Sequence, residues 1–204
     1  MTDYTHLVIS GGGCYGLCLL GVFRYLFIEK KLNNIKYIAG NSCGAFFSLA
    51  YCLKIEIDIL EIMIKDLIKE KNLIIDKHNI CNLFIDNGII DMSIFTNKLK
   101  DYLNNRYDIE DITFLELSKK FALNLYISAT NVNTSKNTIF STDNTPNVSV
   151  FDATCASMTI PYACIPIKIN EEYYIDGILT NNFPINIFNN INKETILGIV
   201  LNIP

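Results

Sequence analysis

The sequence predicts a layered α/β fold built on a central, largely parallel β-sheet. Short apolar segments typical of buried strands alternate with longer helical patterns, mainly in the first half of the chain. Two of these segments lead directly into the glycine-rich turns GGGCYG and GNSCG. The chain has 204 residues, of which 50% are hydrophobic, so residues 1–204 are expected to form a single domain with a large core.

The first half of the chain reads as two strand–helix units followed by a further helix. A strand is predicted over residues 7–10 and a helix over residues 15–31. A second strand covers residues 36–39, and the small and apolar residues 43–54 are typical of a helix packed deep in the core. Residues 56–70 have the spacing of an amphipathic helix, with apolar side chains along one side.

Three more helices are predicted in the second half. Ser93 is a candidate N-cap for a helix that runs to Leu103. A short helix is predicted over residues 113–121. Another is predicted over residues 150–158, and it ends before Pro161 because the residue that precedes a proline disfavours the helical conformation.

The second half also contains two predicted hairpins and a last strand. Residues 123–130 alternate like a strand, and residues 138–141 are its expected hairpin partner across a polar turn. Residues 165–169 and 173–175 form a second predicted hairpin, and residues 196–201 form the last apolar strand.

Charge and cysteine content limit the partners and the compartment. The net charge is −4 and no cluster of lysine or arginine stands out, so no nucleic-acid partner is expected. The seven cysteines form no C-x-x-C pair and have no ligand-like histidine spacing, so no metal or other cofactor is expected. Most of them, including Cys14 and Cys18, lie among apolar residues and are expected to be buried, reduced thiols, which favours a cytoplasmic location.

The second glycine-rich turn places Ser42 in a G-x-S-x-G pattern, the sequence form of a nucleophile elbow. The pattern alone is a weak signal, because an ordinary strand-to-helix turn can also be rich in glycine. Here a predicted strand precedes it and a predicted apolar helix follows, which is the arrangement an elbow requires. Gly40 and Gly44 would relieve crowding at such a strained turn.

The first glycine-rich turn fits two different chemistries. Gly11, Gly13 and Gly16 match the G-x-G-x-x-G fingerprint of dinucleotide-binding sites. That site needs an acidic residue at the end of the second strand to bind the ribose, but the Ser42 turn occupies this place and Glu29 lies inside a predicted helix. The favoured alternative is an oxyanion hole built from adjacent backbone N–H groups at a helix N-terminus.

A serine nucleophile requires a base, and the two histidines are poorly placed to serve Ser42. His6 precedes the first strand, at the opposite edge from the loops that follow the strands, and His78 lies in a polar stretch. Asp176 is the other candidate, because it ends an apolar strand and precedes Gly177 and an asparagine-rich turn. An aspartate before a glycine is also a common turn residue, so the residues alone leave both roles open.

Five segments in this order resemble the patatin-like phospholipase family. Three of them are GGGCYG, GNSCG and DGILTNNFP, and weaker agreement comes from SATN and ASMTIPYACIPI. The resemblance spans residues 7–184 and implies a three-layer fold with a central, mostly parallel sheet flanked by helices. It also implies a Ser42–Asp176 dyad and an oxyanion hole at Gly11, Gly12, Gly13 and Cys14, with Gly16, Gly40, Gly44 and Gly177 as supporting motif residues.

The activity implied by this resemblance is hydrolysis of a lipid acyl ester, of the phospholipase A type, through an acyl-enzyme intermediate. The expected partner is therefore a lipid or acyl-ester substrate, with transient contact at a membrane surface and no nucleic acid. Two departures from the family pattern are Tyr15, where a basic residue is usual, and Ile178, where glycine or alanine is usual. They leave open a catalytically weak protein that binds lipid or a partner, and an acyltransferase on the same dyad is a further alternative. The chain is short for the family, so continuation of the native protein past Pro204 is also left open.

Overall fold

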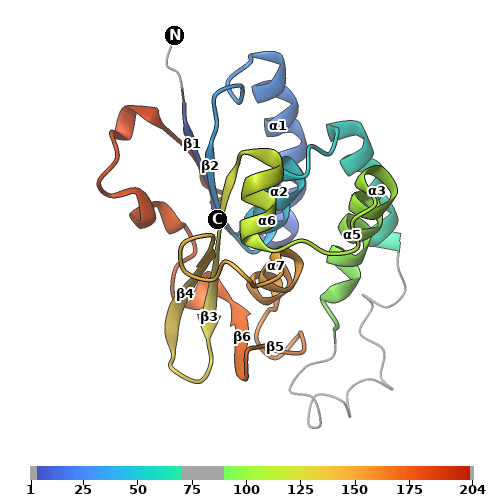
Figure 1. Ribbon diagram of the computed structural model, residues 1–204, viewed down its shortest axis with the longest axis vertical. Coiled ribbons are helices and arrows are strands. Elements are labelled where there is room, and N and C mark those ends of the chain that lie inside the picture. Colours follow the sequence, from blue (N-terminus) through green and yellow to red (C-terminus); the bar gives the residue numbers. More distant parts are fainter. Residues whose placement is uncertain (1–3, 70–89, 203–204) are drawn as a thin grey trace.

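The computed structural model describes residues 4–69 and 90–202 and contains one seven-stranded sheet (Figure 1). In chain order the strands are β1 (His6–Ile9), β2 (Tyr37–Asn41), β3 (Asn124–Asn131), β4 (Lys136–Ser141), β5 (Ile167–Ile169), β6 (Glu172–Asp176) and β7 (Ile196–Ile199). Their order in the sheet is β5-β6-β3-β2-β1-β7, and β4 also pairs with β3.

The sheet has a parallel half and an antiparallel half. Strands β7, β1, β2 and β3 are parallel neighbours, and helices connect β1 to β2 and β2 to β3, as the alternating pattern predicts. The hairpins β3–β4 and β5–β6 are antiparallel, and so is the pairing of β6 with β3. The predicted α/β fold with a central sheet is confirmed, and the two predicted hairpins supply its antiparallel half.

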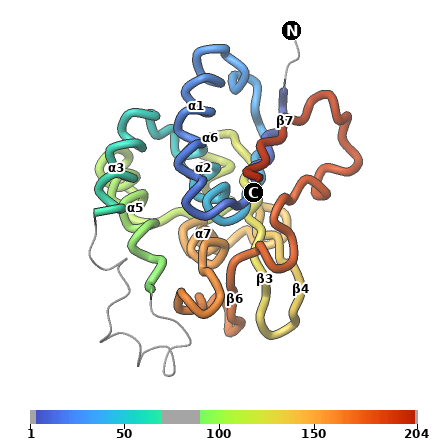
Figure 2. Tube along the Cα trace, turned by 180° about the vertical axis from the view of Figure 1, so that it is seen from behind, coloured from blue at the N-terminus to red at the C-terminus, as the bar shows by residue number. Residues whose placement is uncertain are grey.

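All α-helices of the described residues lie on one side of this sheet. They are to the right of the sheet in Figure 1 and to its left in the reverse view of Figure 2. They are α1 (Cys18–Ile28), α2 (Cys43–Cys52), α3 (Ile57–Lys69), α5 (Ser93–Tyr107), α6 (Phe114–Phe121) and α7 (Val150–Met158). Their buried side chains form one core with sheet residues such as Ile38 and Ile127. Within the described ranges, no helix combines the length and the apolar character needed to cross a membrane.

The opposite face of the sheet has a thinner cover than the predicted layer of helices. Its small core contains Val8 and Ala39 from the sheet together with Phe188. The covering segment between β6 and β7 contains only short 3-10 helices, namely η4 (Gly177–Leu179), η5 (Pro184–Phe188) and η6 (Lys193–Thr195). This segment lies on the side of the sheet away from the α-helices in both views (Figures 1 and 2).

One edge of β3 is shared by two strands, and this sharing positions the site. Along that edge Asn41, at the end of β2, pairs with Ser128 of β3. The next residue of β3, Ala129, pairs with Asp176 at the end of β6. Since β2 runs parallel to β3 and β6 runs antiparallel to it, the two strands approach from opposite directions and end at adjacent register positions.

The predicted helix over residues 15–31 is wrong at both ends. The chain first forms a 3-10 turn, η1 (Gly13–Leu17), and only then the α-helix α1. Gly13 has φ of 52°, and its left-handed backbone separates the turn from the strand before it. At the other end Lys30 is left-handed with φ of 55°, and its N–H and that of Lys31 donate back to carbonyls of the last helical turn.

The predicted cap of α5 is also wrong. The helix begins at Ser93, but Met92 is the N-cap residue and has no side-chain capping bond. Asp91 supplies an acceptor instead, because its Oδ1 accepts the N–H of Ser93 at 2.9 Å. The helix passes the predicted end at Leu103 and stops at Tyr107, where left-handed Asp108 follows.

The cysteines differ from the prediction at two positions. The six described cysteines are free thiols, of which Cys52, Cys155 and Cys164 are buried as expected. Cys14 and Cys18 are exposed, since the η1 turn and the first turn of α1 direct them away from the core. The remaining cysteine, Cys81, lies outside the described residues.

The close contact between α2 and β1 predicts the effect of two glycine substitutions. A Cβ at Gly44 would lie 2.6 Å from the carbonyl oxygens of Ile9 and Ser10, which are backbone atoms that cannot turn aside. We expect Gly44→Ala to lower the free energy of unfolding by about 1–3 kcal/mol, measured by urea denaturation. Gly21→Ala is the matched control, because a Cβ there would meet nothing within 4 Å and should stabilise α1 by about 0.5–1 kcal/mol. Equal loss of stability in both variants would contradict this account.

Candidate active site

Ser42 occupies the sharp turn between β2 and α2, as predicted for an elbow. Its backbone is strained, with φ of 52° and ψ of −125°, a region that residues other than glycine rarely adopt. A hydrogen bond to α7 stabilises the turn: the N–H of Ser42 donates to the hydroxyl of Ser157, a residue of α7, at 2.8 Å. The side chain therefore stands at the N-terminus of α2, beyond the end of the parallel strands.

Gly40 and Gly44 have no room for a side chain, because neighbouring backbone atoms lie too close. Their own dihedral angles are ordinary. A Cβ at Gly40 would lie 2.5 Å from the carbonyl oxygen of Gly44, and the contact of Gly44 itself with β1 is equally tight. The turn can therefore fold back on itself only when both positions lack a side chain. This is the physical basis of the G-x-S-x-G spacing in this chain.

Asp176 lies at the end of β6 with only 2% of its surface exposed. Its Oδ1 accepts the N–H of Ile178 at 2.8 Å and the Asn41 side-chain amide at 3.1 Å. Burial raises the pKa of Asp176 above its ordinary value, while hydrogen bonds from the Ser42 side chain, Ile178 and Asn41 act in the opposite direction. The structure therefore brings Ser42, in the turn after β2, close to Asp176 at the end of β6.

Two polar residues that were not singled out from the sequence complete this arrangement. The buried Asn41 amide donates to Asp176 and also to Oδ1 of Asn182 at 3.1 Å. The Ser157 hydroxyl donates to the Ser128 carbonyl at 2.7 Å, so it ties α7 to β3 as well as to the elbow. The only sequence signal for Asn41 was a polar residue at the end of an apolar strand, directly before the serine.

The first glycine-rich turn contributes fewer free donors than predicted. The N–H of Gly11 donates to the Asn182 carbonyl at 3.1 Å, so it is not available to an oxyanion. Gly12 is the N-cap residue of η1, where a Cβ would lie 2.6 Å from the side chain of Leu201. Gly13 and Cys14 open η1, and no acceptor among the described residues takes their N–H groups.

The supporting and divergent motif residues lie around these groups. Gly16 packs against Cys43, and Gly177 packs against the side chain of Asn41 with no room for a Cβ at either position. Tyr15 and Ile178, the two departures from the family pattern, are both about half exposed, at 46% and 49%. Neither position therefore introduces a buried charge or an extra core contact.

Two other candidate catalytic groups among the described residues, His6 and Cys43, are poorly suited to the reaction by position or by pKa. His6 lies at the start of β1, at the opposite end of the parallel strands from Ser42, where its ring stacks on Tyr37. His78 lies outside the described residues. Burial raises the pKa of the Cys43 thiol to about 11, so this neighbour of Ser42 stays protonated and a poor nucleophile at neutral pH.

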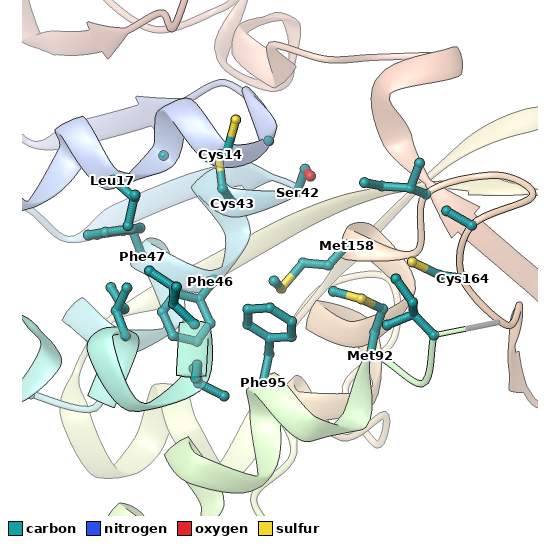
Figure 3. Close-up of a pocket in the computed structure, with 18 residues that line it drawn as sticks. Cys14, Leu17, Ser42, Cys43, Phe46, Phe47, Met92, Phe95, Met158 and Cys164 are labelled. Carbon is teal, nitrogen blue, oxygen red and sulfur yellow. The ribbon is translucent and has the colours of Figure 1, made fainter. Parts of the chain in front are cut away.

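An apolar cavity of about 340 Å³ opens beside Ser42 (Figure 3). Figure 3 shows the side chains of Phe46, Phe95 and Met158 gathered on one side of Ser42. The remaining walls come from η1, α3, Met92 and the segment that follows α7, and none of the described residues that line the cavity carries a charge. Such a cavity suits a hydrocarbon chain whose polar end remains at the serine.

Comparison with known proteins shows which family this chain belongs to. The chain is 33% identical over 187 residues to "Probable lipid hydrolase 463L" of Invertebrate iridescent virus 6. It is 29% identical over 194 residues to "Uncharacterized protein R571" of Acanthamoeba polyphaga mimivirus. The matches cover 90% and 94% of this chain but 63% of each viral protein, so the chain spans about three fifths of the length of these relatives.

Solved structures and a family model agree with these relatives. VipD from Legionella pneumophila superposes with a TM-score of 0.72 at 17% identity, over 97% of this chain and 50% of VipD. The type III effector ExoU superposes with a TM-score of 0.53 at 15% identity, over 98% of this chain and 48% of ExoU, and both likenesses concern the fold alone. The family model for patatin-like phospholipases matches residues 7–189. The chain therefore belongs to the patatin-like phospholipase family.

Proposed function

We propose that this chain is a serine acyl hydrolase that cleaves lipid esters with Ser42 as nucleophile and Asp176 as base. The observation that carries the proposal is the position of Ser42, which stands in a strained elbow between a buried carboxylate and an apolar cavity. Membership of a lipid-hydrolase family supports it. The viral relatives are longer than this chain and are matched over only 63% of their length. That this chain carries the activity is therefore itself part of the proposal.

In the first half of the proposed reaction, the Ser42 oxygen bonds to the ester carbonyl carbon and its proton passes to Asp176. The carbonyl electron pair moves to the oxygen, where the N–H groups of Gly13 and Cys14 stabilise it. Collapse of this intermediate breaks the bond to the alcohol, which takes the proton from Asp176 and leaves an acyl-enzyme.

The second half releases the fatty acid. A water molecule gives a proton to Asp176 as its oxygen bonds to the acyl carbon, and collapse then returns the proton to Ser42. The raised pKa of Asp176 suits this role, because a carboxylate that binds protons more readily is a stronger base when it is ionised. The acyl chain is expected to occupy the cavity next to Phe46 and Met158.

Lipid as the substrate is supported by the residues at the mouth of this cavity. Leu17, Ile68 and Ile160 line it and are nevertheless 46%, 60% and 49% exposed. Apolar side chains at a cavity mouth can contact a lipid surface while an acyl chain passes into the cavity. We therefore include transient membrane contact, and a cytoplasmic location consistent with the free thiols, in the proposal.

Removal of either member of the dyad tests the central proposal. We expect Ser42→Ala and Asp176→Asn each to lower kcat/KM on a soluble short-chain ester by about 10³-fold or more. Labelling by a fluorophosphonate probe should disappear in Ser42→Ala. Asp176→Asn should fold at least as stably as the unmodified chain at neutral pH, since it removes a buried charge and keeps an acceptor for Ile178. Undiminished esterase activity in Ser42→Ala would refute the assignment.

The same assay separates the alternative functions. A folded protein that neither labels nor hydrolyses esters would favour a lipid- or partner-binding member. Acyl transfer to glycerol or a lysolipid in place of water, measured by product analysis, would favour an acyltransferase on the same dyad.

The buried carboxylate predicts a pH dependence. Because Asp176 must be ionised to accept a proton, kcat/KM should fall as the pH is lowered through its raised pKa. In Asn41→Ala the carboxylate loses a donor that favours the ionised form, so this acid limb should move to higher pH and activity at neutral pH should fall by about tenfold. Asn182→Ala is the control, because the Asn182 side chain accepts a hydrogen bond from Asn41 but makes none to the carboxylate of Asp176. An acid limb that stays in place in Asn41→Ala would contradict this role of Asn41.

The cavity mouth can be tested separately from the chemistry. We expect Ile160→Asp to reduce hydrolysis of phospholipid vesicles by about tenfold more than it reduces hydrolysis of a soluble short-chain ester, because the charge at the exposed mouth opposes contact with lipid. Ile28→Asp is the matched control, since Ile28 is 72% exposed but lies on α1 and lines a different cavity. Equal losses on vesicles in both variants would argue against a specific lipid-facing mouth.

A further inference from the structure

A second cavity lies away from Ser42, at the amino-terminal ends of the parallel strands and on the face that η5 covers. Its volume is about 520 Å³. Four of its lining residues carry rings, namely His6 at the start of β1, Tyr37 at the start of β2, Tyr126 of β3 and Phe188 of η5. None of them takes part in the proposed ester hydrolysis.

The four rings contact one another in a continuous arc. The rings of His6 and Tyr37 are stacked, with centroids 4.6 Å apart. Phe188 meets His6 edge-on at 4.7 Å and meets Tyr126 in the same manner at 5.5 Å. Tyr126 pairs with Ala39, two residues along β2 from Tyr37, so the arc begins and ends on neighbouring strands.

The charge in this cavity is negative. The exposed Asp143 lines it, and its Oδ2 accepts the Tyr126 hydroxyl at 3.4 Å. In the part of the chain that the structure describes, no lysine or arginine lines it. Burial lowers the pKa of His6, so its ring is neutral at neutral pH, and the pKa of Tyr126 is raised to about 12, chiefly by burial.

We propose that this cavity binds a quaternary ammonium group such as that of choline. Aromatic faces attract a cation through the ring quadrupole, and a methylated ammonium group gives up less hydration on entering such a site than a primary amine. Asp143 adds a carboxylate at the same cavity, whereas an anionic ligand would find no cationic side chain there. Free choline and the choline of a phospholipid head group share this chemistry.

The test uses calorimetric titration of the unmodified chain with choline and with 3,3-dimethyl-1-butanol, which has the same shape without the charge. We expect choline to bind with Kd on the order of 1 mM and the neutral analogue to bind at least about tenfold more weakly. Glycerophosphocholine identifies the source of the ligand. If glycerophosphocholine binds as choline does, the site accepts a phospholipid head group. If it does not bind, the site takes free choline.

Variants link the binding to these residues. We expect Asp143→Asn, which alters only an exposed side chain, to weaken choline binding by about twofold to fivefold. Tyr126→Leu should weaken it by about fivefold or more, whereas Tyr126→Phe keeps the ring and should bind nearly as well as the unmodified chain. Tyr173→Leu is the control, because Tyr173 is 45% exposed on β6 and does not line the cavity. Equal binding of the neutral analogue, no saturable choline binding, or unchanged binding in both Asp143→Asn and Tyr126→Leu would overturn the proposal.

Discussion

The candidate site depends on the shared edge of β3. A parallel strand and an antiparallel strand end at its adjacent residues Ser128 and Ala129, so residues that are 135 positions apart in sequence, Asn41 and Asp176, become neighbours. The backbone ladder fixes the positions of both strand ends to within one residue, because a slip would turn the side chains to the other face. The side-chain bonds from Asn41 and Ser157 then refine a geometry that the strand pairing has already set.

The sequence predicted those parts of the site that local geometry determines. The elbow could be recognised because part of its geometry is local, as in the close approach of Gly40 to Gly44. The roles of Asn41 and Ser157 could not, because the bond between the elbow and Ser157 joins residues 115 positions apart. Gly11 was predicted to donate to an oxyanion, but its N–H donates to the carbonyl of Asn182. This bond also joins residues far apart in the sequence, so the glycine-rich turn could be predicted but the loss of this donor could not.

For the fold, periodicity located most strands and helices but not the thickness of the layers. A short, continuously apolar strand such as β2 indicates that both faces of the sheet are covered, without indicating what covers them. The second face carries short 3-10 turns around Pro184, and these have too few residues to show a helical period. Helix ends were the least predictable feature, since they depend on single residues such as left-handed Lys30 and on the Asp91 side chain.

Burial of Asp176 also connects acidity with folding. A carboxyl group whose pKa is raised on folding takes up its proton at higher pH in the native state than in the unfolded state. Its charge therefore opposes folding above the native pKa, and this cost shrinks as the pH falls below that value and is gone below the pKa of the unfolded state. If Asp176 is the base, acidification stops turnover because the carboxylate becomes protonated. The same protonation removes the buried charge that destabilises the folded state. For this residue alone, mild acid would produce a dormant, reversible form that recovers on neutralisation without refolding.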